Sequence, residues 1–263
     1  MDLKSVFTFL LMMVFFSSPL YADQTLNQTD SEGRKQGRWV TRYPGGTVMY
    51  EGYFRNDRPE GEFKRYYENG TMKSVMLFSN NGMDAIATLY YENGFVASKG
   101  KYVNQLKEGK WQFFSMLTEG ILVSEEEFRL NLRNGTTVKY YPDGTVAEKI
   151  TYSNDVKNGE WLRFHPDGKP ALKAWYQMGR INGKFESYFE NGKLQFSGSY
   201  LSDLKDGEWK IFNENGTLRY SIVYKLGMTD SKVIDIQQTN YIDSLEKNSR
   251  NIQDPEKNPD LWQ

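Results

Sequence analysis

The chain of 263 residues offers few side chains that could do chemistry. Cysteine is absent and His165 is the single histidine, which removes thiolate nucleophiles, cysteine-ligated metals and sites built from several histidines. The densest acidic run is Glu125-Glu126-Glu127, but neighbouring residues of a strand point to opposite faces, so these carboxylates cannot all converge on one metal ion. No nucleotide-binding glycine motif occurs, and nothing selects a carboxylate pair for sugar hydrolysis. We therefore expect no enzyme, and no catalytic, cofactor or metal site.

The charge balance also narrows the class of partner. Lys and Arg number 33 against 34 Asp and Glu, for a formal net charge of −1. A general nucleic-acid binder needs a basic surface, and electrostatic docking on an anionic membrane needs one too. The remaining partners are a protein or a glycan.

Aromatic residues could bind either of these. Tyr53 and Trp175 stand at an odd, outward-leaning offset where sister segments have Lys101, Thr151 and Ser199. Exposed rings anchor protein partners or stack on sugars; the alternative is that curvature of the sheet covers this face. The candidate partner-binding residues are Tyr53, Trp175, Glu125 and Glu127.

A repeat of 24 residues must position these side chains. One unit has 26 residues, and its two additional residues fall near Ser115–Thr118, as a functional loop or a tolerated bulge. Each unit has a closing turn, such as Glu60-Gly61, and an internal turn, such as Asn69-Gly70; Asn-Gly and Asp-Gly supply the positive φ that tight hairpins require. The eight units fill residues 37–230 and begin at Gly37, Gly61, Ala85, Gly109, Gly135, Gly159, Gly183 and Gly207.

The residues between the turns alternate as in half-buried strands. An aromatic residue follows the opening glycine by two positions in six units, as at Trp111 and Trp209, and another follows the internal glycine by eight positions in all eight units, as at Phe54 and Tyr224. Period-two alternation between turns predicts antiparallel strands. We expect an all-β, elongated array of eight hairpins in one continuous sheet, with aromatic ladders along it. His165 replaces a tyrosine of the sister units, so we interpret it as a scaffold residue.

The two ends differ from the array. Residues 1–22 have the layout of a signal peptide, too short in its apolar part to span a bilayer as a helix. We expect cleavage between Ala22 and Asp23 and export to the periplasm or beyond. Residues 23–36 form a polar leader, either flexible or a short edge cover. Residues 231–263 suggest a capping helix to about Lys247, over the last hairpin edge or docked on a partner, and then a disordered tail.

The repeat resembles the MORN-repeat-variant family. The segments that match most fully are Gly61–Gly70 and Gly183–Gly192, while Gly159-Glu160-Trp161 and Gly207-Glu208-Trp209 open in the same way. The resemblance extends over residues 37–230. The sequence is similar to that of bacterial YwqK-type antitoxin-like proteins. It implies hairpin arrays used for binding, without a catalytic motif.

Together these features predict an exported, non-catalytic scaffold that binds a protein through its exposed sheet face or edge. Two alternatives stay open. One is a carbohydrate or envelope-surface binding module that uses the exposed aromatic residues, and the other is an antitoxin or immunity-like protein.

Overall fold

The structure, a computed structural model, describes residues 25–230. They form one sheet of 19 strands with a single 3-10 turn, η1, at Asn80–Gly82, so the predicted all-β fold is confirmed. The predicted signal peptide, and the predicted capping helix and tail at 231–263, lie outside these residues. The strands are β1 Gln28–Thr29, β2 Lys35–Arg42, β3 Val48–Arg55, β4 Arg58–Tyr66, β5 Met72–Ser79, β6 Asp84–Tyr90, β7 Val96–Val103, β8 Leu106–Phe114, β9 Leu122–Arg129, β10 Leu132–Arg133, β11 Gly135–Tyr140, β12 Val146–Ser153, β13 Val156–Phe164, β14 Pro170–Gln177, β15 Arg180–Ile181, β16 Gly183–Tyr188, β17 Leu194–Leu201, β18 Leu204–Phe212 and β19 Leu218–Tyr224.

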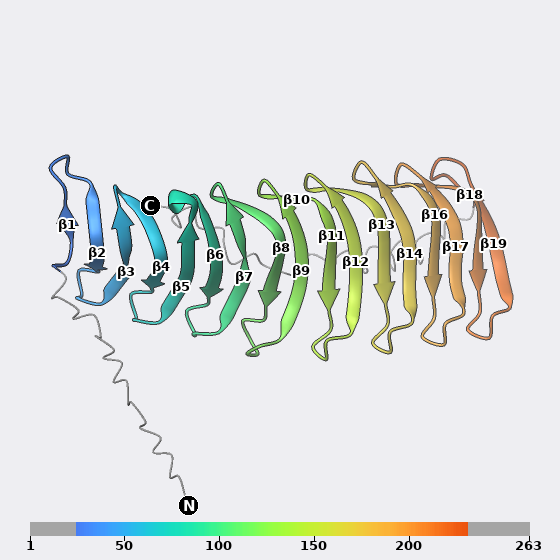
Figure 1. Ribbon diagram of the computed structural model, residues 1–263. Coiled ribbons are helices and arrows are strands. Elements are labelled where there is room, and N and C mark those ends of the chain that lie inside the picture. The colour runs from blue at the N-terminus through green and yellow to red at the C-terminus, as the bar shows by residue number, and fades with distance from the viewer. Residues whose placement is uncertain (1–24, 231–263) are drawn as a thin grey trace, which may run out of the picture.

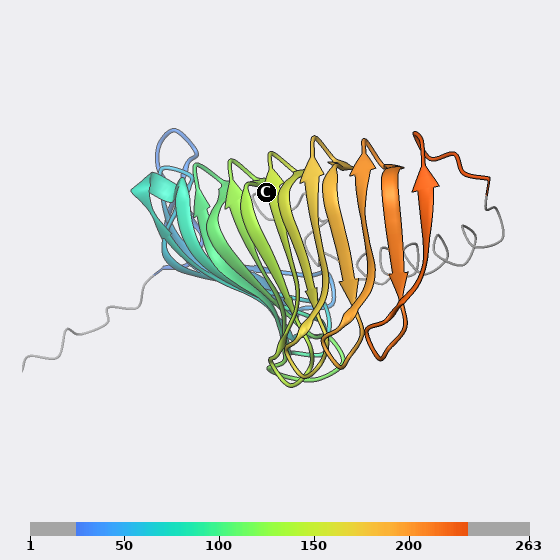
Figure 2. The ribbon, with the colours of Figure 1, turned by 90° about the vertical axis from the view of Figure 1, so that its right-hand side faces the viewer.

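The sheet is an antiparallel meander. Each long strand pairs with the next along the chain, and the two-residue strands β10 and β15 are inserted beside β9 and β14. Successive hairpins therefore extend one twisted array from β1 to β19 (Figure 1). Closing turns follow one another along one edge and internal turns along the other. The view along the array shows how strongly the strands twist between these edges (Figure 2).

The glycine turns behave as their sequence predicts. In the turn between β4 and β5, Gly70 has φ +88° and donates its N–H to the Tyr67 carbonyl at 2.9 Å. The Asn69 side chain accepts the N–H of Thr71 at 2.8 Å. The two additional residues of the long unit lie in the turn between β8 and β9, where the Ser115 hydroxyl accepts the N–H of Leu117 at 3.1 Å.

One face of the sheet, here called the ring face, carries the buried aromatic residues. The rings that follow the opening glycines meet the rings that end the second strands: the centroids of Tyr102 and Trp111 are 4.9 Å apart, and those of Tyr200 and Trp209 are 5.1 Å apart. Trp111, Trp161 and Trp209 are almost fully buried. The predicted ladder of rings is present in both halves of the array, and it is interrupted between Phe128 and Ile150. Such pairs contribute about 0.5–1.5 kcal/mol beyond the area that they bury.

Glycines within strands make room for this ladder. At Gly52, Gly100 and Gly198 an ideal Cβ would lie 2.1 to 2.2 Å from an atom of the ring opposite, which belongs to Phe63, Trp111 or Trp209. The sister position in β5 is Met76, and its cross-strand partner is Ala87. In the pairs named here a small residue faces a large ring, or a large residue faces a small one, which keeps the volume of each pair; Ile150, which faces Trp161, departs from this.

Lysine side chains cover the rings of the ring face near the closing turns. The Nζ of Lys107 lies 4.8 Å from the Trp111 ring centroid and 5.0 Å from that of Phe128, and Lys205 lies 5.0 Å from that of Tyr224. Their aliphatic stems cover the rings while the ammonium groups interact with the π faces.

The core is divided in the middle of the array. One cluster of buried apolar side chains runs from Phe63 to Phe128 and the other from Ile150 to Tyr224. The ring-face positions between them are polar, and Glu148 is only 3% exposed. Its carboxylate accepts the indole N–H of Trp161 at 3.0 Å and lies 3.2 Å from Lys139 Nζ.

A row of aromatic side chains links the internal turns. The hydroxyl of Tyr43 donates to the Tyr66 carbonyl at 2.8 Å, and that of Tyr67 donates to the Tyr90 carbonyl at 2.7 Å. His165 continues the row, with its Nε2 3.0 Å from the Tyr188 carbonyl oxygen. The geometry supports the interpretation of His165 as a scaffold residue.

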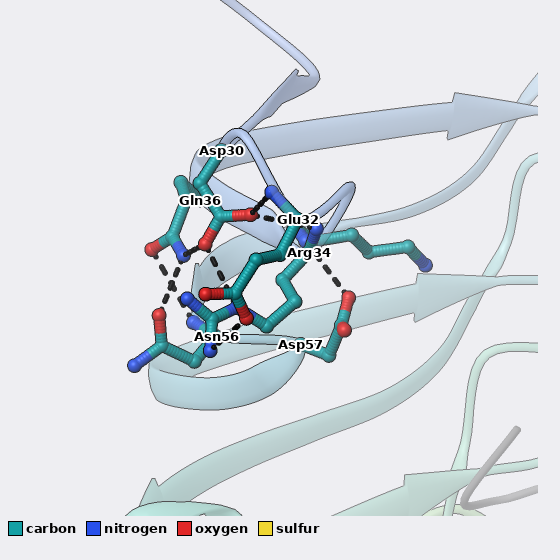
Figure 3. A network of polar contacts seen from close by, with 7 residues as sticks. Asp30, Glu32, Arg34, Gln36, Asn56 and Asp57 are labelled. Atoms are coloured by element: carbon teal, nitrogen blue, oxygen red, sulfur yellow. Dashed lines mark hydrogen bonds and ion pairs between the residues drawn. The ribbon is translucent and has the colours of Figure 1, made fainter.

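A polar network fastens β1 to the first hairpin (Figure 3). The Asp30 carboxylate accepts the N–H groups of Glu32 and Arg34, the Arg34 guanidinium at 2.8 Å and the Gln36 amide at 2.9 Å. Desolvation alone would raise the pKa of Asp30, but these hydrogen bonds, led by those from Arg34, lower it to about 2. The polar segment before β2 therefore covers the first edge of the sheet.

Acid should release this cover. A carboxyl whose pKa is lower in the folded than in the unfolded state stabilises the fold above its unfolded pKa, near 3.8, and that stabilisation is lost as the pH falls to about 2. We expect the amide protons of residues 28–36 to lose protection between about pH 4 and pH 2 before the rest of the sheet does. Hydrogen exchange with Asp30→Asn as the control tests this, since that variant should show no such step.

Candidate interaction face

The face opposite the ring face, here called the open face, carries the predicted partner-binding residues. Alternation along each strand sends Tyr53, Glu125, Glu127 and Trp175 to this side, as the cross-strand pairs show. A row of half-buried rings, including Tyr66, Tyr140 and Tyr188, lies on it near the internal turns. The open face is therefore partly covered near the internal turns and exposed toward the closing turns.

Trp175 stands in the exposed part. Its side chain, on β14, is 52% exposed. It lies directly opposite Glu160 of β13, and among the described residues no hydrogen bond or ion pair engages the Glu160 carboxylate. An open hollow of about 630 Å³ surrounds the indole and is lined by Asn158, Glu160, Lys173, Ala174, Trp175, Gln177, Asn182, Gly183, Lys184 and Glu186.

The polar wall of this hollow is held in place by its own contacts. Lys184 Nζ lies 2.7 Å from a Glu186 oxygen, and the Tyr188 hydroxyl donates to the other oxygen at 3.0 Å. Desolvation raises the pKa of Glu186, but the hydrogen bonds from Lys184 and Tyr188 outweigh it and leave the pKa lowered. Desolvation and the Glu186 contact raise the pKa of Tyr188 to about 12. The hollow thus combines a flat apolar ring, one open carboxylate and a fixed ion pair.

Tyr53 lies in a similar setting near the start of the array. It is 41% exposed on β3, between Arg38 of β2 and Glu60 of β4. The open hollow around it measures about 500 Å³ and is rich in charged residues. Glu51 at its wall accepts the Tyr66 hydroxyl at 2.7 Å, which is the main cause of its lowered pKa.

Glu125 and Glu127 differ from each other. Glu125 is held by Gln112 at 2.9 Å, Lys110 at 3.0 Å and Tyr140 at 3.2 Å, and the hydrogen bond from Gln112 is the largest of the contacts that lower its pKa. Glu127 is exposed on the same strand, next to Gly135. Glu125 therefore stabilises the sheet, whereas Glu127 is accessible to a partner.

The structure does not gather the four predicted residues into one site. They lie on β3, β9 and β14, and many strands separate Tyr53 from Trp175 (Figure 1). Sequence reasoning missed Glu160, on the neighbouring strand β13, and Asn182, between β15 and β16; both line the hollow around Trp175. The strand alternation predicts the position of Glu160. It immediately precedes the buried Trp161, so its side chain must lie on the opposite, open face.

Two other kinds of site, for a metal ion and for a membrane, concern residues 25–230. No group of three or more His, Asp or Glu side chains within that range could hold a metal ion. No helix of the same range is long and apolar enough to cross a membrane.

Comparison with known proteins identifies the repeat. The family model described as MORN repeat variant matches residues 59–80, 133–154, 157–177, 181–201 and 205–226. No curated protein matches the chain. Among solved structures, a complex titled TcdB2-TccC3-Cdc42 matches at 11% identity with a TM-score of 0.21, and TcdB2-TccC3 matches at 12% with a TM-score of 0.21. The chain spans only 14% and 15% of the length of those chains, while 74% and 77% of it is covered.

Proposed function

Because this chain carries repeats of the MORN-repeat-variant family, we propose that it is an exported, non-catalytic scaffold that binds a protein partner through its open face. Export rests on the signal-peptide pattern of residues 1–22. The array comprises eight units in this proposal, of which those beginning at Gly37, Ala85 and Gly109 have diverged from the family pattern.

The exposed Trp175 carries this proposal. Residues whose truncation costs a complex 2 kcal/mol or more are enriched in Trp, Tyr and Arg. An indole that is 52% exposed beside the open carboxylate of Glu160 offers a partner both apolar area and a charge to pair. A basic side chain of the partner could meet the carboxylate while an apolar one covers the ring.

Replacing Trp175 should abolish most of the binding. The immobilised full chain is used to capture proteins from the exported fraction of its own source, followed by mass identification. We expect Trp175→Ala to weaken capture of the main partner at least about 30-fold, since a hot-spot residue is worth about 2 kcal/mol or more. The fold should be unaffected because the ring lies outside the core.

Val223 provides the matched control. It occupies the sister position on β19, lies on the same face and is 70% exposed. Val223→Ala should bind as the parent protein does. Equal capture by the Trp175→Ala variant and the parent would contradict the proposal.

Carbohydrate binding is the second candidate, favoured by the polar wall around the same ring. Sugars stack on exposed aromatic faces while their hydroxyls hydrogen-bond to carboxylates and amides, and Glu160 and Asn182 flank Trp175. Retention of glycan without any protein, lost in Trp175→Ala, would favour this function over the first.

A further inference from the structure

Exposed apolar side chains follow the closing-turn edge of the array. They occupy seven consecutive turns, from η1 to the turn after β19, along the upper edge in Figure 1. The most exposed are Met178 at 81%, Met228 at 72% and Leu130 at 63%. This set, here called the turn ridge, consists of Met83, Leu106, Leu130, Leu132, Val156, Met178, Leu201, Leu204, Leu226 and Met228.

The opposite edge is different in character. Its internal turns are built from Asn, Asp, Gly, Pro and charged residues. Its exposed large apolar residues, among those described, are Met116 and Leu117 in the lengthened turn and Leu218. Apolar exposure on the turn ridge is therefore not a general property of the turns, and an exposed apolar patch of this extent marks an interaction surface.

The backbone of the turn ridge is already paired. The N–H of Asn131 donates to the Lys107 carbonyl at 3.0 Å, that of Asp155 to the Arg133 carbonyl at 2.9 Å, and that of Gly179 to the Lys157 carbonyl at 2.8 Å. A partner cannot bind these turns by adding a strand, since that mode uses free backbone groups. The ridge offers side chains only, held at a fixed spacing by the bonds between turns.

The spacing of the closing turns indicates which partner binds the turn ridge. Neighbouring turns are two strands apart, which is about 9–10 Å. A partner must have the same period to contact successive turns of the ridge with equivalent side chains. A second copy of this chain has this period by construction, and two-fold dimers are the commonest homo-oligomers.

The size of the turn-ridge edge also agrees with a dimer interface. With the polar residues between its apolar ones, the edge presents roughly two dozen exposed residues, within the about 20–30 that each partner contributes to a stable interface. We infer that two copies of this chain pair through their turn ridges, antiparallel about a two-fold axis near Val156. This turn is the fourth of the seven, so the axis leaves the open faces of both copies available to other partners.

The oligomeric state of the full chain tests this inference. Light scattering and sedimentation should give a dimer. The variant Leu130→Ser/Met178→Ser/Leu204→Ser should be monomeric, with a dissociation constant raised at least about 100-fold, because each dimer loses six apolar side chains from the interface. The control Met116→Ser/Leu117→Ser/Leu218→Ser removes three apolar residues from the opposite edge and should remain dimeric. Circular dichroism verifies that both variants fold.

Cross-linking tests the axis. Since the chain has no cysteine, Val156→Cys introduces a single thiol that should link to its own counterpart through a short bis-maleimide. Met83→Cys, far from the axis, should link poorly to itself.

Four outcomes would overturn the inference. They are a monomer at every concentration, a dimer that survives the ridge substitutions, binding of the monomer to phosphatidylcholine vesicles through the ridge, and equal linking at both cysteines. The Trp175→Ala variant should still dimerise, so failure here and failure of the proposed open-face binding are distinguishable.

Discussion

Gly100→Val should lower the free energy of unfolding by about 3 kcal/mol, at the upper end of what overpacking a core costs. A Cβ at this position would lie 2.1 Å from the Trp111 ring, which is completely buried and has no space to withdraw. Urea unfolding followed by far-ultraviolet circular dichroism measures the loss. Gly45 is the control: nothing lies within 4 Å of a Cβ placed there and its φ is not in the left-handed region, so Gly45→Val should be nearly neutral.

The same site allows a sharper test. Gly100→Met combined with Trp111→Ala reproduces the pair that the protein already uses at Met76 and Ala87. We expect the double variant to be more stable than the sum of the two single losses predicts, because the new side chain fills the space that the indole leaves. Additive losses would show that conservation of volume across the strands does not explain the glycines.

Much of the fold follows from local sequence signals. Asn69-Gly70 and its counterparts need positive φ, and aromatic residues at fixed offsets from them predict a strand buried on one face. These rules act within about ten residues, so the hairpins, the single sheet and the buried rings of Trp111 and Trp209 could all be predicted. The exposure of Tyr53 and Trp175 could be predicted for the same reason, since alternation decides the face.

Features that depend on contacts between units could not be predicted in this way. The role of Gly100 becomes visible only once the register places it against Trp111. The sequence predicts Glu125 as a partner-binding residue, yet its carboxylate accepts hydrogen bonds from Gln112 and Lys110 of the preceding strand and from Tyr140 beyond the next turn. The turn ridge could not be predicted because its successive turns are 22 to 26 positions apart in the sequence, and one or two apolar residues in a single turn carry no signal.

Removing the Glu148 carboxylate should also cause a large loss in the free energy of unfolding. Glu148→Ala deprives Trp161, Lys139 and Arg163 of a carboxylate that is only 3% exposed, and breaking a buried charge pair costs about 3–5 kcal/mol. The site lies between the two apolar clusters, and a repeat array is held together by contacts between neighbours. We therefore expect the variant to unfold in two separated steps, with exchange protection lost first on one side of β12.

Replacing Lys139, Glu148 and Arg163 together by apolar residues tests whether the buried charges, and not a loss of packing, divide the core. The next units have Leu172 and Phe196 where this one has Glu148. In the variant Lys139→Met/Glu148→Leu/Arg163→Leu no charge is left buried, and the two clusters become continuous along the ring face. Such replacements of buried ion pairs are often neutral or stabilising by about 1–4 kcal/mol. A single, sharper transition at equal or higher denaturant concentration is expected; two steps in this variant would mean that the polar group does not divide the core.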